Sequence, residues 1–187
     1  MSSPLLPGLQ LQPLPYHDHL PLRDTNTLEL VVVHCTELPD LATAREYGER
    51  VLYDSGAGNS GHFYIDRDGT VVQYVAPERI AHHVRGMNIH SIGIELVNRG
   101  RYPHWFDSRC QSMDEPYSEA QLLALERLLL ALATRYPSLR AIAGHDQLDL
   151  EQVPASDDPA LRVARKRDPG PLFPWPRILA RVPLLPL

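Results

Sequence analysis

The run LELVVVHC at residues 28–35 constrains the fold most, because it is almost wholly apolar and rich in β-branched side chains. Such a run predicts a strand that is buried inside the molecule. The segment HFYIDRDGTVVQYV at 62–75 predicts a hairpin in which Asp68 and Gly69 supply the turn. LRAIAGH at 139–145 predicts a short strand that ends at a histidine.

A cleanly alternating strand is predicted for SIGIELVN at residues 91–98. Its isoleucine and leucine side chains face one way, while Ser91, Gly93 and Glu95 face the other. The second face carries small side chains and one carboxylate, so it has room for a ligand.

Two helices are predicted from their capping residues. Asp40 can cap a helix that runs to about Tyr53, and Ser118 forms a capping box with Gln121 that opens a helix through about Tyr136. Strand-like and helix-like segments alternate in the order that an α/β fold needs. We therefore expect a central mixed β-sheet flanked by helices, in three layers.

The remaining segments are irregular. Residues 1–27 are rich in proline and leucine and predict an extended arm that packs on a single domain formed by 28–187. The stretch 99–117 predicts a long loop, and loops of that length are often functional. The tail, 150–187, is expected to be loop-like apart from a short helix around 176–181.

Composition excludes several classes of function. The net charge of −5 argues against a nucleic-acid partner, which needs a basic face. No apolar run approaches the roughly 20 residues that span a bilayer. The N-terminus has no Lys or Arg before Arg23, and prolines interrupt it, so it does not resemble a signal peptide. We expect a cytoplasmic protein in which Cys35 and Cys110 are free thiols.

Three candidate metal ligands, His34, His145 and Asp168, lie at the ends of predicted elements. Zinc accepts imidazole nitrogen and carboxylate oxygen, and a catalytic zinc site keeps one position open. Pro169 and Pro171 would stiffen the loop that carries Asp168. Spacing alone favours a structural or exposed role for these histidines. The chain has nine histidines, and one at a strand end more often has such a role than a metal-binding one.

Glu95 and Lys166 are a second candidate pair. A carboxylate in a zinc site can act as general base, and a cation there can stabilise the oxyanion that forms when an amide carbonyl is attacked. Lys166 lies two residues before Asp168, so it can reach the same site, while the side chains of Arg165 and Arg167 should point elsewhere. The alternatives are a surface ion pair for Glu95 and a solvated charge for Lys166.

These segments together resemble the N-acetylmuramoyl-L-alanine amidase type 2 family, which includes AmpD enzymes, phage amidases and peptidoglycan recognition proteins. The matching pieces occur in the family's order and cover nearly all of residues 28–180. They are VVVHCTE, SGHFYIDRDGTVVQYV, AHHVRGMNIHSIGIELVN, YSEAQLLALERLL, AGHDQLDL and RKRDPGPLFPW. SIGIEL and the Lys-x-Asp-Pro-Gly-Pro pattern are specific to the family when they occur together.

The resemblance implies roles for five residues. His34, His145 and Asp168 match the ligands of one zinc ion per chain. Glu95 and Lys166 match the catalytic residues. Non-catalytic members typically lose a ligand, whereas this chain keeps all three.

The resemblance also implies a substrate groove. His83 falls where the family carries a cleft histidine, and Arg85 and Asn88 lie in the segment that lines the groove. Two departures concern substrate choice: His82 stands where AmpD-like sequences often have tryptophan, and the stretch 99–117 differs from that of the cytosolic enzymes.

The implied function is hydrolysis of the amide bond between N-acetylmuramic acid, in its 1,6-anhydro form, and L-alanine during cell-wall recycling. The partner would be a muropeptide or peptidoglycan, and we expect a monomer. Three alternatives remain at this point: an amidase of intact peptidoglycan, a peptidoglycan-binding module without turnover, and a zinc peptidase that cuts the stem peptide.

Overall fold

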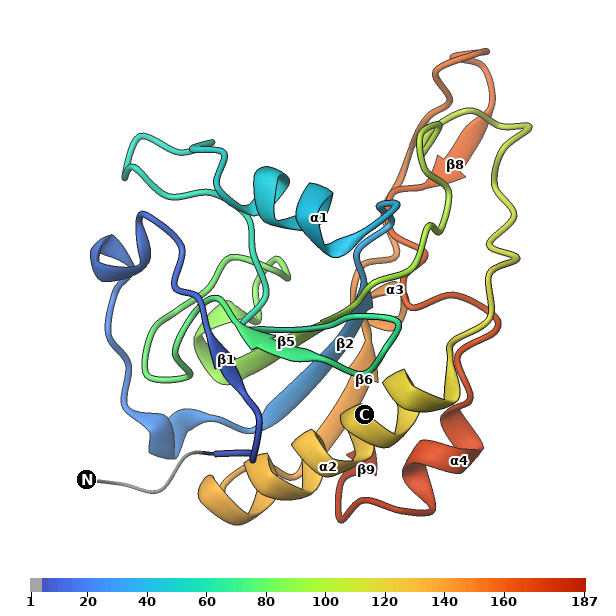
Figure 1. Ribbon diagram of the computed structural model, residues 1–187. Coiled ribbons are helices and arrows are strands. Elements are labelled where there is room, and N and C mark those ends of the chain that lie inside the picture. Colours follow the sequence, from blue (N-terminus) through green and yellow to red (C-terminus); the bar gives the residue numbers. More distant parts are fainter. Residues whose placement is uncertain (1–4) are drawn as a thin grey trace.

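A seven-stranded mixed β-sheet forms the centre of the structure, a computed structural model that describes residues 5–187 (Figure 1). The pair β3–β4 is antiparallel, and every other neighbouring pair is parallel. Across the sheet, the strands are β1 (Gln10–Leu11), β4 (Val71–Gln73), β3 (Phe63–Ile65), β5 (Ser91–Leu96), β2 (Leu30–Cys35), β6 (Ala141–Gly144) and β9 (Leu185–Pro186).

β2 lies between β5 and β6, and all of its side chains are buried. Val33 pairs with Ile94 of β5 and with Gly144 of β6, and both neighbours run parallel to β2. The carboxyl ends of the three strands therefore meet at one edge of the sheet. The predicted strands and the predicted hairpin, β3–β4, are confirmed.

Helices cover both faces of the sheet (Figure 1). α2 (Glu119–Arg135) and α4 (Trp175–Leu179) lie on one face, and α1 (Leu41–Gly48) lies on the other. The short helices are η1 (His17–His19), η2 (Thr25–Thr27), η3 (Asn88–His90) and α3 (His145–Leu148). This arrangement confirms the predicted mixed sheet flanked by helices.

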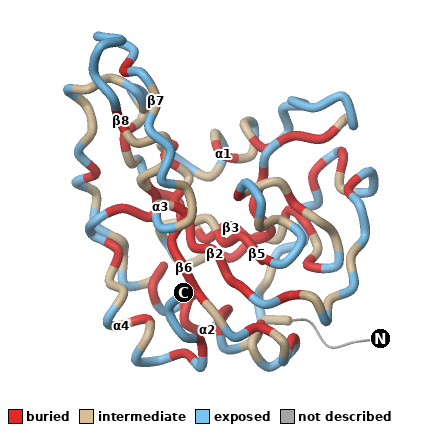
Figure 2. Tube along the Cα trace, turned by 180° about the vertical axis from the view of Figure 1, so that it is seen from behind, coloured by how far each residue is buried: buried red, intermediate tan, exposed pale blue. Residues whose placement is uncertain are grey.

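The leucine-rich side of α2 forms the main core. The helix begins at the predicted capping box, in which the Gln121 backbone N–H donates to Ser118 Oγ at 3.0 Å. Its buried leucines pack with side chains of β2 and β5 in one cluster, which includes Leu125, Leu128, Leu129, Leu132, Val31, Val33, Ile92 and Ile94. Figure 2 shows that the buried residues concentrate on these central strands. No helix among residues 5–187 is long and apolar enough to cross a membrane.

α1 is shorter than predicted. Asp40 caps it as expected, but the helix ends at Gly48 and does not reach Tyr53. The Tyr16 hydroxyl donates to the Gly48 carbonyl at 2.6 Å, and the N–H of Tyr53 donates to Ala57 and not back into a helix. Val51, the apolar residue that would continue the helix, is 60% exposed. No burial therefore stabilises another helical turn.

The tail was wrongly predicted as loop-like apart from one helix. β7 (Gln152–Pro154) and β8 (Arg162–Ala164) form an antiparallel hairpin that projects beside the segment 99–117 (Figure 1). The Ser156 N–H donates to the Phe106 carbonyl at 2.8 Å, and this bond joins the hairpin to the segment 99–117. The hairpin was missed because it pairs only with itself and carries few apolar residues, and it is largely exposed in Figure 2.

The described part of the N-terminal segment, residues 5–27, lies against the sheet. Its strand β1 pairs with β4, and its side chains Leu14, Tyr16 and Leu20 are buried. The first four residues of the predicted arm lie outside the described residues. The division at residue 27 stays a prediction. The two cysteines, Cys35 and Cys110, are free thiols.

Candidate active site

Three buried side chains converge at the carboxyl edge of the central strands. His34 is in β2, His145 is the first residue of α3, and Asp168 lies in the loop before α4. Their potential ligand atoms all lie within 4.8 Å of one another. Nδ1 of His34 and Nδ1 of His145 lie 2.9 and 3.1 Å from Oδ2 of Asp168. The structure thus brings together the three predicted ligands from distant parts of the chain.

His145 differs in one respect from the prediction, because it begins a helix and does not end the strand. β6 ends one residue earlier, at Gly144. The Gly144 N–H donates to the side chain of Gln147 at 2.8 Å, and this local contact turns the chain into α3. A Cβ added at Gly144 would lie 2.8 Å from Pro169 Cδ and would also meet the Asp146 carboxylate, so this turn favours glycine.

The loop that carries Asp168 is held from two sides. The Asp168 carbonyl accepts the N–H of Asp146 at 2.9 Å, which ties the loop to α3. The Tyr117 hydroxyl donates to the Pro169 carbonyl at 2.6 Å, just before α2 begins. These two bonds fix the carboxylate against the histidines.

The protonation states suit a metal site. Burial lowers the pKa of His34 to about 4, and the charge of His145 acts in the same direction. Burial acts to raise the pKa of Asp168, but the charges and hydrogen bonds of the two histidines outweigh it and hold that pKa well below its usual range. Metals bind neutral imidazole and ionised carboxylate.

Two buried atoms of this cluster, His145 Nε2 and Asp168 Oδ1, have no hydrogen-bond partner within residues 5–187. Buried polar atoms are rarely left unpaired. Two imidazoles and one carboxylate also form a donor set typical of catalytic zinc. The residues present therefore fit a zinc ion.

Glu95 lies beside this cluster. It pairs in register with His34 across β5 and β2, and its Oε1 atom lies 3.9 Å from His34 Nδ1. Burial raises the pKa of Glu95 to about 8, the charge of Asp168 adds to the increase, and the charge of Lys166 opposes it. Its side chain remains 15% exposed, so it can exchange a proton with a molecule in the pocket.

Gly61 and Gly93 leave space for neighbouring side chains, as the small-residue face of residues 91–98 predicted for Gly93. A Cβ added at Gly93 would lie 2.6 Å from the ring of His83, and one added at Gly61 would lie 2.9 Å from Glu95 Cγ. Any side chain at these two positions would displace the histidine or the carboxylate.

Lys166 lines the same pocket, and its charge affects the pKa of both Glu95 and His34. Its side chain makes no hydrogen bond or ion pair with the part of the chain that the structure describes. The prediction that both neighbouring arginines point elsewhere was wrong for Arg165, which also lines the pocket. The Arg165 guanidinium forms ion pairs with Asp149 and Glu151.

His83 is half-buried, lies beside His34 and lines the pocket. Its Nδ1 atom lies 3.0 Å from His34 Nε2, and its Nε2 atom lies 3.2 Å from the Ser91 hydroxyl. Burial holds the pKa of His83 well below its usual range, and the charge of His34 adds to this effect. His83 therefore supports the orientation of the His34 ring, and its predicted contact with substrate stays a prediction.

Arg85 and Asn88 also line the pocket, in different ways. The Asn88 carboxamide oxygen accepts the N–H groups of His83 and Val84 at 3.0 and 2.8 Å, so this side chain shapes its own loop. Arg85 is 71% exposed on the rim and pairs with Glu151 at 2.7 Å. Their substrate-binding roles stay predictions.

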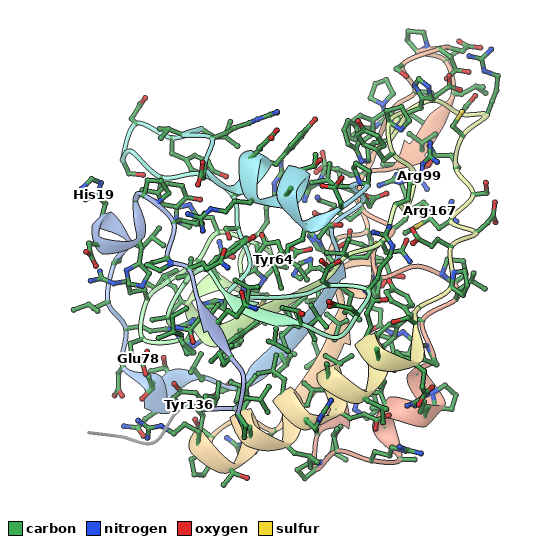
Figure 3. The ribbon with its side chains drawn as sticks, in the orientation of Figure 1. His19, Tyr64, Glu78, Arg99, Tyr136 and Arg167 are labelled. Carbon is green, nitrogen blue, oxygen red and sulfur yellow. The ribbon has the colours of Figure 1, made fainter. Side chains whose placement is uncertain are left out.

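The pocket has a volume of about 560 Å³ and extends from the ligand cluster toward α1. Tyr64 forms part of it, and Figure 3 shows this side chain between α1 and the sheet. Several lining residues were not predicted from the sequence, which are Glu37, Tyr47, Arg50, Arg101 and Trp105. Two of them belong to the segment 99–117, whose length was the one signal that pointed to them.

A family model described as N-acetylmuramoyl-L-alanine amidase matches residues 24–171. The chain belongs to this amidase family. A curated relative, the 1,6-anhydro-N-acetylmuramyl-L-alanine amidase AmpD of Citrobacter freundii, is 30% identical over 192 residues, which cover 91% of this chain and 88% of the relative. The resemblance inferred from the sequence motifs is confirmed.

Solved structures share the architecture of this amidase. A crystal structure of AmpD superposes with a TM-score of 0.66 at 27% identity and covers 95% of this chain and 96% of that one. An endolysin amidase from Clostridium intestinale superposes with a TM-score of 0.68, over 96% of this chain and 98% of that one. Its identity of 20% shows the fold alone.

Proposed function

We propose that this protein is a zinc-dependent amidase that hydrolyses the bond between N-acetylmuramic acid and L-alanine in 1,6-anhydro muropeptides. One observation carries the proposal: the His34, His145 and Asp168 cluster shares a pocket with Glu95 and Lys166 in a member of this amidase family. The anhydro form of the substrate is supported by the name of the AmpD relative, which aligns along nearly its whole length.

The residues divide the chemistry between them. His34, His145 and Asp168 would hold the zinc ion. When bound, zinc polarises a carbonyl and lowers the pKa of water. In its ionised form, Glu95 accepts the proton of the water that attacks the amide carbonyl and then passes it to the amine of L-alanine. Lys166 stabilises the negative charge that develops on the carbonyl oxygen.

We expect the purified protein to bind about one zinc ion per chain, because the cluster offers three protein ligands. His34→Ala, His145→Ala and Asp168→Ala should each lose the metal, as measured by metal analysis after dialysis. His104→Ala is the matched control, since this histidine is exposed and outside the pocket. Full zinc retention in all three ligand variants would refute the assignment.

The form of the substrate needs a separate experiment. We expect 1,6-anhydro muropeptides to be hydrolysed faster than intact sacculi when both are digested side by side and the products are identified by mass. Release of L-alanine-terminated peptides identifies amidase activity, whereas cleavage within the stem peptide would identify a peptidase. Faster release from sacculi would favour a lysin, and binding without products would indicate a recognition module.

The same proposal includes a cytoplasmic location, which cell fractionation would test. It also includes a monomeric state, which light scattering would test.

A further inference from the structure

A buried ion pair between Arg101 and Glu37 forms part of the pocket wall. Arg101 Nε donates to Glu37 Oε1 at 2.7 Å, and Arg101 Nη2 donates to Glu37 Oε2 at 2.8 Å. The side chains are 1% and 8% exposed. Burying two charges costs desolvation energy that their attraction often does not recover, so stability alone is a weak explanation for such a pair.

The same guanidinium also holds the segment that carries Lys166. It donates to the carbonyl of Ala164 at 2.8 Å and to the carbonyl of Arg165 at 3.3 Å, directly before the lysine. A further bond, to Gln111 Oε1 at 3.2 Å, ties it to its own loop. Arginine has five N–H donors in a rigid fork, which suits one side chain to several acceptors at once.

Glu37 is held in an unusual backbone conformation. Its φ angle is 49°, in the left-handed region that residues other than glycine rarely adopt. The Trp105 indole donates to its carbonyl at 3.1 Å, and a Cβ at Gly100 would lie 2.6 Å from its Cγ. Such a conformation persists where the surroundings enforce it, commonly at functional sites.

The segment that carries Lys166 is also held by its backbone, since β8 pairs with β7 as far as Ala164, opposite Gln152. On its C-terminal side, the loop is fixed by the bonds to the carbonyls of Asp168 and Pro169. On its N-terminal side, the Arg165 N–H donates to the Glu151 carbonyl at 2.8 Å, and Arg101 supplies the side-chain bonds to the backbone. The lysine side chain itself has no polar partner in the described chain, so its backbone sets its position.

We propose that Arg101, oriented by Glu37, is a positioning residue that fixes the backbone at 164–166 and so directs Lys166 toward the reacting carbonyl. This inference rests on the proposed amidase function. The segment 99–117 then has a role in catalysis, because it supplies Arg101. The Arg101 guanidinium connects Glu37, which follows β2, with Ala164, the last residue of β8.

A double-mutant cycle tests the inference on the zinc-loaded enzyme. Arg101→Lys keeps the charge, but a single ammonium cannot bridge a carboxylate and two carbonyls. We expect kcat to fall by a factor on the order of 10 to 10², with KM little changed, because the lysine is displaced and substrate binding is not. In a Lys166→Ala background, the same substitution should change kcat by no more than about twofold, because its target is gone.

Hydrogen exchange provides a readout that does not depend on activity. Arg101→Lys should speed exchange of the amides at 162–168 and leave those of α2 unchanged. Arg177→Lys is the matched control: Arg177 pairs with Glu119 and Glu126 on the far side of the core, so exchange at 162–168 and kcat should both stay as in the wild type. If Arg101→Lys does not fold, Glu37→Gln, which keeps one oxygen acceptor, enters the same cycle.

The outcomes separate the two proposals. Equal losses of kcat in both backgrounds would show a general structural effect and overturn the positioning role, as would unchanged exchange at 162–168. A wild-type protein with no amidase activity would refute the proposed function, while the exchange experiment would still decide whether Arg101 fixes the lysine's backbone.

Discussion

Glu95→Gln is expected to lower the turnover of the muropeptide amide by a factor of about 10² to 10⁴, the usual contribution of a general base. Glutamine has nearly the same shape, so it fits the space beside Gly61 that Glu95 occupies. Its amide cannot accept the proton that the carboxylate takes from the attacking water. The fold and the bound zinc should be retained, because the three proposed ligands are unchanged.

The measurement is steady-state release of peptide from an anhydro muropeptide, with zinc content and thermal unfolding recorded on the same preparation. Glu46→Gln is the control, because it makes the same change on the exposed side of α1, outside the pocket. A rate close to that of the wild type would reassign Glu95 to substrate contact or to structure.

Lys166→Ala is expected to lower kcat and kcat/KM together by a factor on the order of 10² to 10³, with KM little changed. A donor that stabilises the oxyanion acts on the transition state and not on the bound substrate. The preceding residue, Arg165, is already paired with Asp149 and Glu151, so we expect it not to replace the lost charge. Zinc content should be unchanged, because a protonated lysine has no lone pair to offer a metal.

Arg167→Ala is the control for this variant. It removes a cation one residue away that does not line the pocket, so kcat should be unaffected. A Lys166→Ala variant whose KM rises while kcat is maintained would show that the lysine binds substrate uniformly, for instance through a carboxylate of the stem peptide.

The elements whose signals are local could be predicted from the order of amino acids alone. β2 followed from a run of β-branched residues, β5 from its alternation, and α2 from the capping box of Ser118 and Gln121. The face on which Glu95 lies followed from the same alternation, because successive side chains of a strand point in opposite directions. Each of these features depends on residues only a few positions apart, so a single sequence contains the information.

The end of α1 and the completion of the pocket depend on contacts between residues far apart in the chain. The Tyr16 hydroxyl that caps the Gly48 carbonyl lies 32 residues away in the chain, and Glu37 and Arg101 are 64 residues apart. Glu37 and Arg101 are single charged residues in irregular segments, which have no period and no capping pattern to reveal them. Their contact arises because the neighbouring parallel strands β2 and β5 bring the loops that follow them to one edge of the sheet. Burial there requires each charge to find a partner.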